Sequence, residues 1–482
     1  MERGRSVPDS RARTDPRAMS CCGPSRRTVL GAIGLAATLP MLNTGRGGAQ
    51  ANPLFATDLE VVTITDTSVI ITWTTCSPDA AGRPLPADAD AEVLLGPADG
   101  LGPLVQVYYD AAPTPYHYAE IYGLEPGRTY RFEARSRGVR ATPALNLVSG
   151  APGTPESTGE FTTLTPPPGR LLHTIALSND VHYGETISGI IADGLPPGFS
   201  QDVPPYPEVM LAALLDDARA RGAERLLVAG DLTAEATPEQ SRAVRARLDS
   251  WGVLGRDYLV ARGNHDRPHI GADYAGCPVY AGDHRDCWGE QFLPRQELTE
   301  HTLGELRIIG LDTSQLDGSG GSIERPQLDR LGEILRADPD RPTVVFGHHP
   351  VTAESGLTNI AGPAFVLDAP TSAELQGMYE RAPGVFLQHS GHTHRNRRTR
   401  PDANCAVEFL EVAAVKEYPG GYSLLRVYEG GYMVNFYKTR SPGARLWSTT
   451  TRGEYYGFYP DYTLGTCADR NHAVSRDFSG LV

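Results

Sequence analysis

Two patterns of hydrophobic and polar positions alternate along most of the chain. Apolar runs of strand length, such as 171–178 and 225–229, are followed by stretches whose apolar residues recur at helical spacing, such as 207–221. This alternation predicts an α/β layered fold with both sheet faces covered. The other expected strands are 258–261, 306–311, 343–346, 385–387 and several between 406 and 437, and the other expected helices are 238–251, 327–335 and 372–381.

Residues 55–164 have a different pattern and predict an all-β domain. The run 69–75 is β-branched and aromatic, and we expect Trp73 within it to lie in a core. The segment 124–130, Leu-Glu-Pro-Gly-Arg-Thr-Tyr, resembles the tyrosine corner of a fibronectin type III sandwich, whose tyrosine hydroxyl bonds to nearby backbone. We therefore predict a fibronectin type III-like β-sandwich over 52–165, followed by a stiff Pro-rich linker.

The N-terminus resembles an export signal. Arg26 and Arg27 directly precede the apolar stretch 31–42, which is too short and too rich in Gly and Ala for a transmembrane helix. The paired arginines resemble a twin-arginine signal, and Ala-Gln-Ala at 49–51 offers a cleavage site. We predict a signal peptide and tail over 1–51; a disordered basic tail is the alternative.

An export signal implies a partner and a location. The partner is the twin-arginine export machinery, and the mature protein would be secreted, periplasmic or associated with the cell wall, with no membrane span after signal removal. Met19 is an alternative start to Met1, because the first 18 residues are more than such a signal needs.

Length and charge limit the possible partners. The 482 residues suffice for two or three domains, and the formal net charge is −14. We expect no nucleic-acid partner, because a negative chain repels a phosphate backbone. A small phosphorylated substrate remains compatible, because bound metal ions reverse the local sign of the field.

The seven cysteines predict disulfides rather than a thiolate metal site. Cys277 and Cys287 flank a short loop and are expected to pair in an oxidising compartment. Cys405 and Cys467 are expected to form a second bridge, which leaves Cys76 as a buried apolar residue. Cys21 and Cys22 fall in the signal. A thiolate zinc site is not expected, because the chain has no C-x-x-C spacing.

Five short polar blocks follow or nearly follow the apolar runs expected to be strands. Each block supplies Asp, Asn or His, the side chains that bind hard to borderline divalent metals. Ligands at the ends of successive strands are what a two-metal hydrolase requires, because two ions together activate water and neutralise phosphate charge. The blocks are Asp180-Val181-His182, Gly230-Asp231, Gly263-Asn264-His265-Asp266, Gly347-His348-His349-Pro350 and Gly391-His392-Thr393-His394.

The order of these blocks resembles that of the calcineurin-like metallophosphoesterase superfamily. The resemblance implies a layered α/β/β/α domain, which we place at 170–440, with a C-terminal extension at 441–482 packed on it. It also implies two divalent ions, Mn, Fe or Zn, and in-line attack on a phosphate mono- or diester by a hydroxide that bridges them. The implied ligands are Asp180, His182 and His394 for one ion, Asn264, His348 and His392 for the other, and Asp231 as the bridge.

Two further roles follow from the same resemblance. His265 would contact the phosphoryl group and protonate the leaving oxygen, and Asp266 would orient its imidazole. A β-sandwich before such a domain resembles the layout of purple acid phosphatases. Those enzymes have a tyrosine three residues after the bridging aspartate, whereas Ala234 occupies that position here, so an Fe(III)-tyrosinate is not expected.

Other polar residues receive plainer interpretations. His349 is expected beside the ligands rather than among them, and Asp312 is expected either to assist the site or to act as a structural acceptor. Solvated surface is the default for Arg395, Lys416 and Glu417, and a place near the mouth of the site is the alternative for all three. Structural hydrogen bonding is the better interpretation for His173, His389 and His472.

Two alternatives to a general phosphoesterase stay open. A cyclic-nucleotide phosphodiesterase fits the third and fourth polar blocks equally well. A phosphate-binding or adhesion pseudoenzyme is the alternative outside catalysis, and the intact ligand set argues against it.

Overall fold

The computed structural model describes residues 53–481 except 101, 191–192, 196–205 and 402–404. The predicted signal peptide over 1–51, with Cys21 and Cys22, lies outside the described residues. Residues 50–482 form one compact unit. Within the described ranges, no helix combines the length and the apolar character needed to cross a bilayer.

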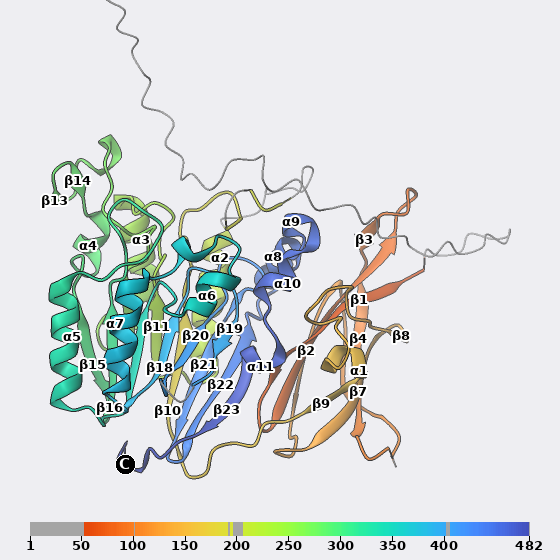
Figure 1. Cartoon of the computed structure of the whole chain (residues 1–482). Coiled ribbons are helices and arrows are strands. Elements are labelled where there is room, and N and C mark those ends of the chain that lie inside the picture. The colour runs from red at the N-terminus through yellow and green to blue at the C-terminus, as the bar shows by residue number, and fades with distance from the viewer. Residues whose placement is uncertain (1–52, 101, 191–192, 196–205, 402–404, 482) are drawn as a thin grey trace, which may run out of the picture. The chain divides into compact units, whose positions relative to one another are not determined.

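The first part of this unit is a sandwich of two antiparallel sheets (Figure 1). Trp73 lies in its core at 1% exposure, as predicted. The Tyr130 hydroxyl accepts a hydrogen bond from the Glu125 backbone N–H at 2.9 Å, which is the backbone contact expected at a tyrosine corner. The β-sandwich is confirmed, and its assignment to the fibronectin type III class stays a prediction. One sheet contains β1 (Phe55–Ile64), β2 (Ser68–Pro78), β3 (Pro84–Pro86) and β6 (Tyr116–Tyr122), and the other contains β4 (Ala89–Pro97), β5 (Val105–Thr114), β7 (Thr129–Ser136), β8 (Val139–Arg140) and β9 (Glu160–Thr162).

The second part contains two six-stranded mixed sheets that share a core. The apolar runs form their central parallel strands because these strands are buried on both faces. The first sheet has the order β12 (Tyr258–Ala261), β11 (Arg225–Ala229), β10 (Leu171–Ser178), β21 (Gly421–Tyr428), β22 (Gly431–Lys438) and β23 (Asn471–Ser475). The second has the order β15 (Thr299–Leu303), β16 (Leu306–Leu311), β17 (Thr343–Gly347), β18 (Val385–Ser390), β20 (Glu408–Glu411) and β19 (Arg397–Thr399).

Helices cover the outer faces of both sheets. The helix α2 (Tyr206–Ala220) and the helix α3 (Pro238–Asp249) pack on the first sheet, and their apolar residues join one core with both sheets. The helix α5 (Arg325–Ala337) and the helix α7 (Ala369–Glu380) pack on the second sheet in a separate core. The resulting order, helix, sheet, sheet, helix, confirms the predicted layered fold.

The chain after residue 440 forms short helices and a final strand. The first helix, α8 (Pro442–Thr451), places Trp447 against Tyr206 of α2, with ring centroids 4.2 Å apart. The strand β23 pairs with β22 and so extends the first sheet. Between these elements lie α9 (Glu454–Gly457), α10 (Tyr459–Thr463) and α11 (Cys467–Arg470).

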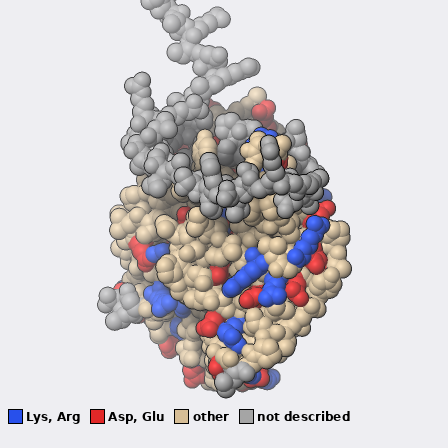
Figure 2. Space-filling view, turned by 90° about the vertical axis from the view of Figure 1, so that its right-hand side faces the viewer, with Lys and Arg blue, Asp and Glu red and all other residues tan. Residues whose placement is uncertain are grey.

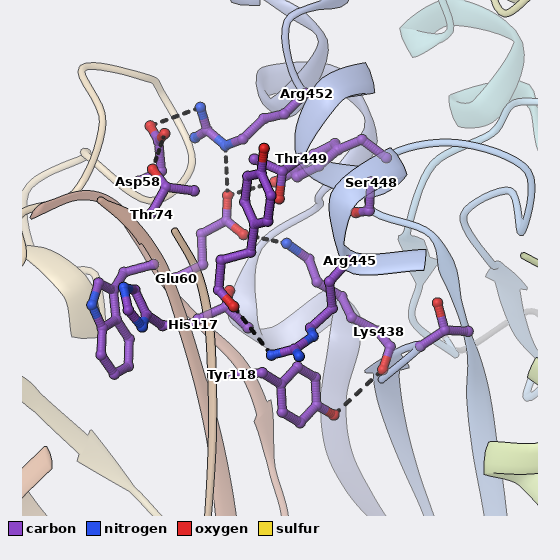
Figure 3. A pocket seen from close by; sticks show the side chains of 15 residues that line it. Asp58, Glu60, Thr74, His117, Tyr118, Lys438, Arg445, Ser448, Thr449 and Arg452 are labelled. Atoms are coloured by element: carbon purple, nitrogen blue, oxygen red, sulfur yellow. Dashed lines mark hydrogen bonds and ion pairs between the residues drawn. The ribbon is translucent and has the colours of Figure 1, made fainter. Parts of the chain in front are cut away.

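A polar pocket lies between the sandwich and the elements β22 and α8 (Figure 3). The Glu60 carboxylate of the sandwich lies 2.5 Å from the Lys438 ammonium and 3.1 Å from the Arg452 guanidinium. The Tyr418 hydroxyl donates to the same carboxylate at 2.7 Å. These charged contacts around the buried Glu60 connect the sandwich to the α/β part, beside the apolar contact that Val62 and Ile70 make with the larger core.

Charges of both signs are mixed on the outer surface. On the face in Figure 2, Lys and Arg side chains lie beside Asp and Glu side chains over much of the described surface. The chain's excess of acidic residues is therefore not gathered into a single field on that face.

One of the two predicted disulfides forms. Cys277 and Cys287 are bonded, which confirms the first bridge. The second prediction is wrong, because Cys405 and Cys467 are both thiols. Cys405 is buried in the core beneath α5 and α7, whereas Cys467 packs against the core of the sandwich.

Candidate metal centre

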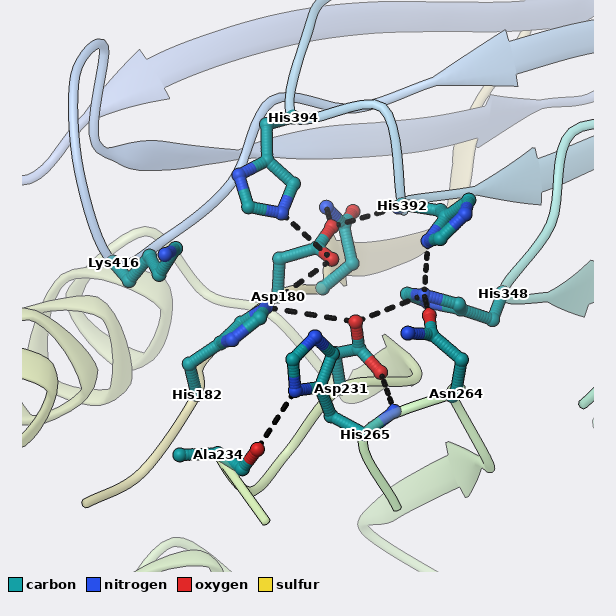
Figure 4. Close-up of polar contacts among 12 residues, drawn as sticks. Asp180, His182, Asp231, Ala234, Asn264, His265, His348, His392, His394 and Lys416 are labelled. Carbon is teal, nitrogen blue, oxygen red and sulfur yellow. Dashed lines mark hydrogen bonds and ion pairs between the residues drawn. The ribbon is translucent and has the colours of Figure 1, made fainter. Parts of the chain in front are cut away.

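The predicted ligands lie on turns that follow five strands, β10, β11, β12, β17 and β18. Because these strands are parallel within their sheets, their carboxyl ends bring the turns together between the two sheets (Figure 4). Gly263 permits the closest approach, since a Cβ there would lie 2.1 Å from Asp231 Oδ1. All seven predicted ligands are buried.

Five of the ligands adopt the left-handed backbone conformation that non-glycine residues rarely take. Each such conformation costs on the order of 1–3 kcal/mol and persists only where the surrounding structure imposes it. Strain of this kind, repeated around one point, is typical of a functional site. The five are Asp180 (φ 52°), His182 (φ 47°), Asp231 (φ 51°), His392 (φ 68°) and His394 (φ 55°).

One group of ligand atoms converges on His348. Its Nε2 lies 3.0 Å from Asn264 Oδ1, 3.0 Å from His392 Nδ1 and 3.1 Å from Asp231 Oδ2. His348 Nδ1 faces the Ala229 carbonyl at 2.8 Å and carries the proton of that hydrogen bond when the ring is neutral. The neutral ring then presents a lone pair to three other acceptor atoms.

A second group converges on Asp180. Its Oδ1 lies 3.3 Å from His394 Nε2 and 3.8 Å from His182 Nε2. Its other oxygen accepts the His392 backbone N–H at 2.9 Å, so only Oδ1 is directed at the group. Asp231 Oδ2 lies 3.5 Å from His182 Nε2 and 3.1 Å from His348 Nε2, and is therefore the atom that both groups share.

These donor sets fit two divalent cations. Asp180 Oδ1 and His182 Nε2 are buried without a hydrogen-bond partner, and buried acceptors facing one another are costly unless a cation lies among them. Burial would lower the pKa of His348, yet Asp231 raises it to about 9. A positive charge is thus favoured at this point, whether a proton or a metal ion carries it. Nitrogen and oxygen donors of this kind suit Mn, Fe or Zn.

His265 reaches the edge of the centre and is the only predicted site residue that is partly exposed. Its backbone N–H donates to Asp231 Oδ1 at 2.8 Å, and its Nδ1 donates to the Ala234 carbonyl at 2.7 Å. Burial lowers its pKa to about 4. The ring is therefore neutral near pH 7, with its Nε2 available as an acceptor.

The predicted role of Asp266 is wrong. Its carboxylate accepts the backbone N–H groups of Leu232 at 3.0 Å and Thr233 at 2.9 Å, together with the Thr233 hydroxyl at 2.7 Å. It also accepts the Gly263 N–H at 3.1 Å. Asp266 therefore holds the turn that carries Asp231, and the Ala234 carbonyl takes the orienting role at the His265 ring.

Three residues behind the centre were not predicted to contact it. Glu185 Oε2 lies 2.9 Å from His182 Nδ1, and Glu417 Oε1 lies 2.6 Å from His394 Nδ1. Lys416 lies between these carboxylates. Solvated surface is the wrong interpretation for Lys416, Glu417 and Arg395, because all three are buried. The only sequence signal is the three-residue spacing of Glu185 from His182, which is weak by itself.

The other interpretations of polar residues agree with the structure. His349 lies against the ligands His348 and His392, while its Nδ1 contacts the Thr313 hydroxyl at 2.8 Å. Asp312 is a structural acceptor for the Ser314 and Gln296 backbone. Three histidines were expected to make structural hydrogen bonds. His173 contacts Glu224, His389 contacts the Ser178 carbonyl and His472 contacts Glu408.

Comparison with known families agrees with this geometry. Residues 173–396 match the family described as calcineurin-like phosphoesterase, a range that contains all seven predicted ligands. The chain is similar to this family over that range, which begins within β10 and ends two residues after His394.

Two curated relatives match part of the chain. A probable cyclic nucleotide phosphodiesterase of Synechococcus sp. is 28% identical over 185 residues, which cover 38% of this chain and 63% of that protein. A probable glycerophosphodiester phosphodiesterase of Arcobacter nitrofigilis is 25% identical over 172 residues, which cover 35% of this chain and 56% of that protein. In both cases the match spans less than two thirds of the relative's length.

Solved structures of phosphatases are similar at a lower level. The purple acid phosphatase PPD1 from yellow lupin (Lupinus luteus) has a TM-score of 0.42 and 15% identity, covering 89% of this chain and 76% of that one. A dimetal phosphatase from Danio rerio has a TM-score of 0.41 and 13% identity, covering 56% of this chain and 98% of that one.

Proposed function

We propose that this protein is a metal-dependent phosphoesterase that hydrolyses phosphate mono- or diesters. The observation that carries the proposal is the convergence of seven buried ligands in two groups that share Asp231 Oδ2. The two groups would hold two divalent ions, which would activate water for in-line attack at neutral pH and neutralise charge on the phosphoryl oxygens.

The chain's own residues would prepare the site for that chemistry. Asp266 and Gly263 fix the turns that present Asp231. His265, neutral and partly exposed, would contact the phosphoryl group through Nε2 and take up a proton there when an anionic substrate binds. Protonated His265 would then donate to the leaving oxygen.

The decisive experiment replaces the shared carboxylate. Asp231→Asn should abolish phosphoesterase activity and reduce bound metal together, because one oxygen serves both ligand groups. Activity would be measured with an aryl phosphate monoester, a bis-aryl diester and a cyclic nucleotide in the presence of Mn²⁺, and metal by elemental analysis. A metal-loaded, active variant would contradict the bridge, and wild-type protein that binds metal without cleaving any ester would favour the pseudoenzyme.

A cyclic-nucleotide phosphodiesterase is the second candidate. It is favoured by the similarity to the probable cyclic nucleotide phosphodiesterase of Synechococcus sp.. The same three substrates separate the candidates, since this one requires the cyclic nucleotide to have the highest kcat/KM.

We also propose that the protein is exported by the twin-arginine pathway. The Arg26-Arg27 pair supports this, as does the disulfide between Cys277 and Cys287, since such bonds persist in oxidising compartments. Replacing both arginines by lysine should retain the protein inside the cell. Cell fractionation that finds the variant exported as well as wild type would refute the pathway.

A further inference from the structure

Buried ion pairs line the side of the metal centre that carries His182 and His394. The Lys416 ammonium lies 2.6 Å from Glu185 Oε1 and 3.5 Å from Glu417 Oε2. The same two carboxylates contact the Nδ1 atoms of His182 and His394 (Figure 4 shows Lys416 beside both rings). The side chains of Lys416 and Glu417 have 0% exposure, so bulk solvent does not screen their pairing.

The Glu417 contact determines which nitrogen of His394 faces the centre. An ionised carboxylate can only accept hydrogen bonds, so His394 Nδ1, which is bonded to Glu417, must carry the proton. In the neutral ring Nε2 is then a lone-pair donor directed at Asp180. Glu185 lies beside His182 Nδ1 at ion-pair distance, without a hydrogen bond to it. A carboxylate behind a histidine ligand fixes its tautomer and ring orientation and makes it a stronger base.

The C-terminal segment, residues 441–463, holds the three consecutive residues 416–418. Trp447 Nε1 donates to the Lys416 carbonyl at 2.7 Å, and the Tyr418 N–H donates to the Thr451 hydroxyl at 2.9 Å. Between them, the Tyr459 hydroxyl donates to Glu417 Oε1, the oxygen that also contacts His394. Three hydrogen bonds from the C-terminal segment thus hold this turn, and both the turn and the segment lie after the family-matched residues 173–396.

The same segment reaches Glu417 from a second direction through Ser188. The Ser188 hydroxyl lies 2.9 Å from Glu417 Oε2 and 2.5 Å from Glu454 Oε1. A hydroxyl has one proton, so with Ser188 donating to Glu417, the Glu454 carboxyl must donate to Ser188. Glu417 is therefore fixed through both of its oxygens.

We propose that Glu185, Lys416 and Glu417 are positioning residues of the metal centre, and that the C-terminal segment belongs to that centre through Tyr459. The proposal rests on the proposed function, because it concerns the ligands of the ion held by Asp180, His182 and His394. It assigns to residues after 440 a part in metal binding that the five polar blocks do not contain.

The test compares Glu417→Gln and Tyr459→Phe with a matched control in the full chain. Glu408→Gln is the control, because Glu408 is another fully buried carboxylate that contacts a histidine, His472, at 2.7 Å. Calorimetric titration of the metal-free proteins with Mn²⁺ gives stoichiometry and affinity, and denaturant unfolding without metal gives stability. We expect Glu417→Gln to weaken one of two bound ions by about 10–100-fold. Tyr459→Phe should weaken the same ion to a smaller extent, and Glu408→Gln should change stability alone.

Each outcome decides one claim. Wild-type protein that binds no Mn²⁺ would overturn the proposed function itself. Two ions bound normally by wild type and by Glu417→Gln would overturn the positioning role and leave the proposed function standing. Equal weakening by Glu408→Gln would show a general effect of buried charge instead. If Glu417→Gln does not fold, Tyr459→Phe, which removes a single hydroxyl, still decides whether the C-terminal segment acts on the centre.

Discussion

His265 and Asp231 of the metal centre each have a side chain with two polar atoms, and the contact that one atom makes decides which atom is left to act at the centre. His265 uses Nδ1 on the Ala234 carbonyl, so its Nε2 is the atom that can act on a substrate. Asp231 uses Oδ1 on the His265 backbone, so its Oδ2 is the shared one. The sequence predicted the residue types of the ligands because each stands in a short block beside a strand. It could not predict Lys416 and Glu417, because their partners come from segments far away along the chain.

Replacing His265 by Ala should separate metal binding from turnover. The backbone N–H that contacts Asp231 remains, so metal content should be unchanged, while kcat should fall about 10²–10⁴-fold with the loss of proton transfer. Elemental analysis and steady-state kinetics measure the two quantities. His301→Ala, on the edge strand β15, is the control and should change neither. Loss of metal from His265→Ala would show that the ring is a ligand.

The pH dependence of the free enzyme provides a second check on this residue. Burial holds the pKa of His265 near 4, below its ordinary 6.5, so the ring gains a proton only as pH falls below about 5. The pH profile of kcat/KM should therefore contain no His265 ionisation between pH 5 and 8. Wild type and His265→Ala should show the same ionisations in that range.

At the scale of elements, the sequence pattern predicted the strands that are buried on both faces. The strands β10, β11, β12 and β16 have the predicted bounds, because their continuous apolar runs are buried on both faces. The edge strands β15 and β19 were missed. Residues of β15 alternate between half-buried and exposed with little apolar character, and β19 is three residues long and carries two arginines. Edge strands depend on a neighbour for pairing, which a local pattern does not contain.

The hairpin of β13 (Val279–Ala281) and β14 (His284–Arg285) is the element that depends most on its disulfide. The bond from Cys277 to Cys287 closes a loop with a sequence separation of 10 around it. Replacing both cysteines by serine should lower the free energy of unfolding by about 2–3 kcal/mol, mainly by loosening the unfolded chain. Denaturant unfolding with and without reductant measures the loss.

The reductant supplies the control for that prediction. It should destabilise the wild type and Cys76→Ser equally, because Cys76 is a thiol, and should leave the double serine variant unaffected. A wild type insensitive to full reduction would contradict the stabilising role of the bond.

At the scale of the whole molecule, charged side chains around the buried Glu60 join the sandwich to the α/β part. Glu60, Lys438 and Arg452 come from segments that no local pattern connects, so the sequence predicted both parts and could not predict their interface. The sandwich and the α/β part have separate apolar cores. Val62 and Ile70 are the sandwich residues that pack in the larger core.

Removing Glu60 should destabilise the protein strongly. Glu60→Met leaves Lys438 and Arg452 beside an apolar side chain, and breaking such a buried pair costs about 3–5 kcal/mol. Glu60→Met with Lys438→Met should recover much of the loss. Glu239→Ala, which removes an exposed pair with Arg242, should change stability by less than about 1 kcal/mol. A full double-mutant cycle by denaturant unfolding measures the coupling, and a value near zero would rule out the pair as a stabilising contact.

Acid should weaken the same interface. Burial would raise the pKa of Glu60, but Lys438 and Arg452 lower it from 4.5 to about 2. The folded value is depressed, so this stabilisation is complete above pH 4.5 and is lost as pH falls from there toward 2. The Glu60→Met variant should lack that part of the acid dependence.

The hydrogen bond from Tyr459 to Glu417 also imposes an order of events during biosynthesis. All seven ligands leave the ribosome before Tyr459, which follows Glu417 by 42 residues. A nascent chain that ends at residue 440 would already contain every coordinating atom, yet the support behind His394 would be missing. Loading with metal should therefore reach full strength only after the segment that contains Tyr459 has been synthesised.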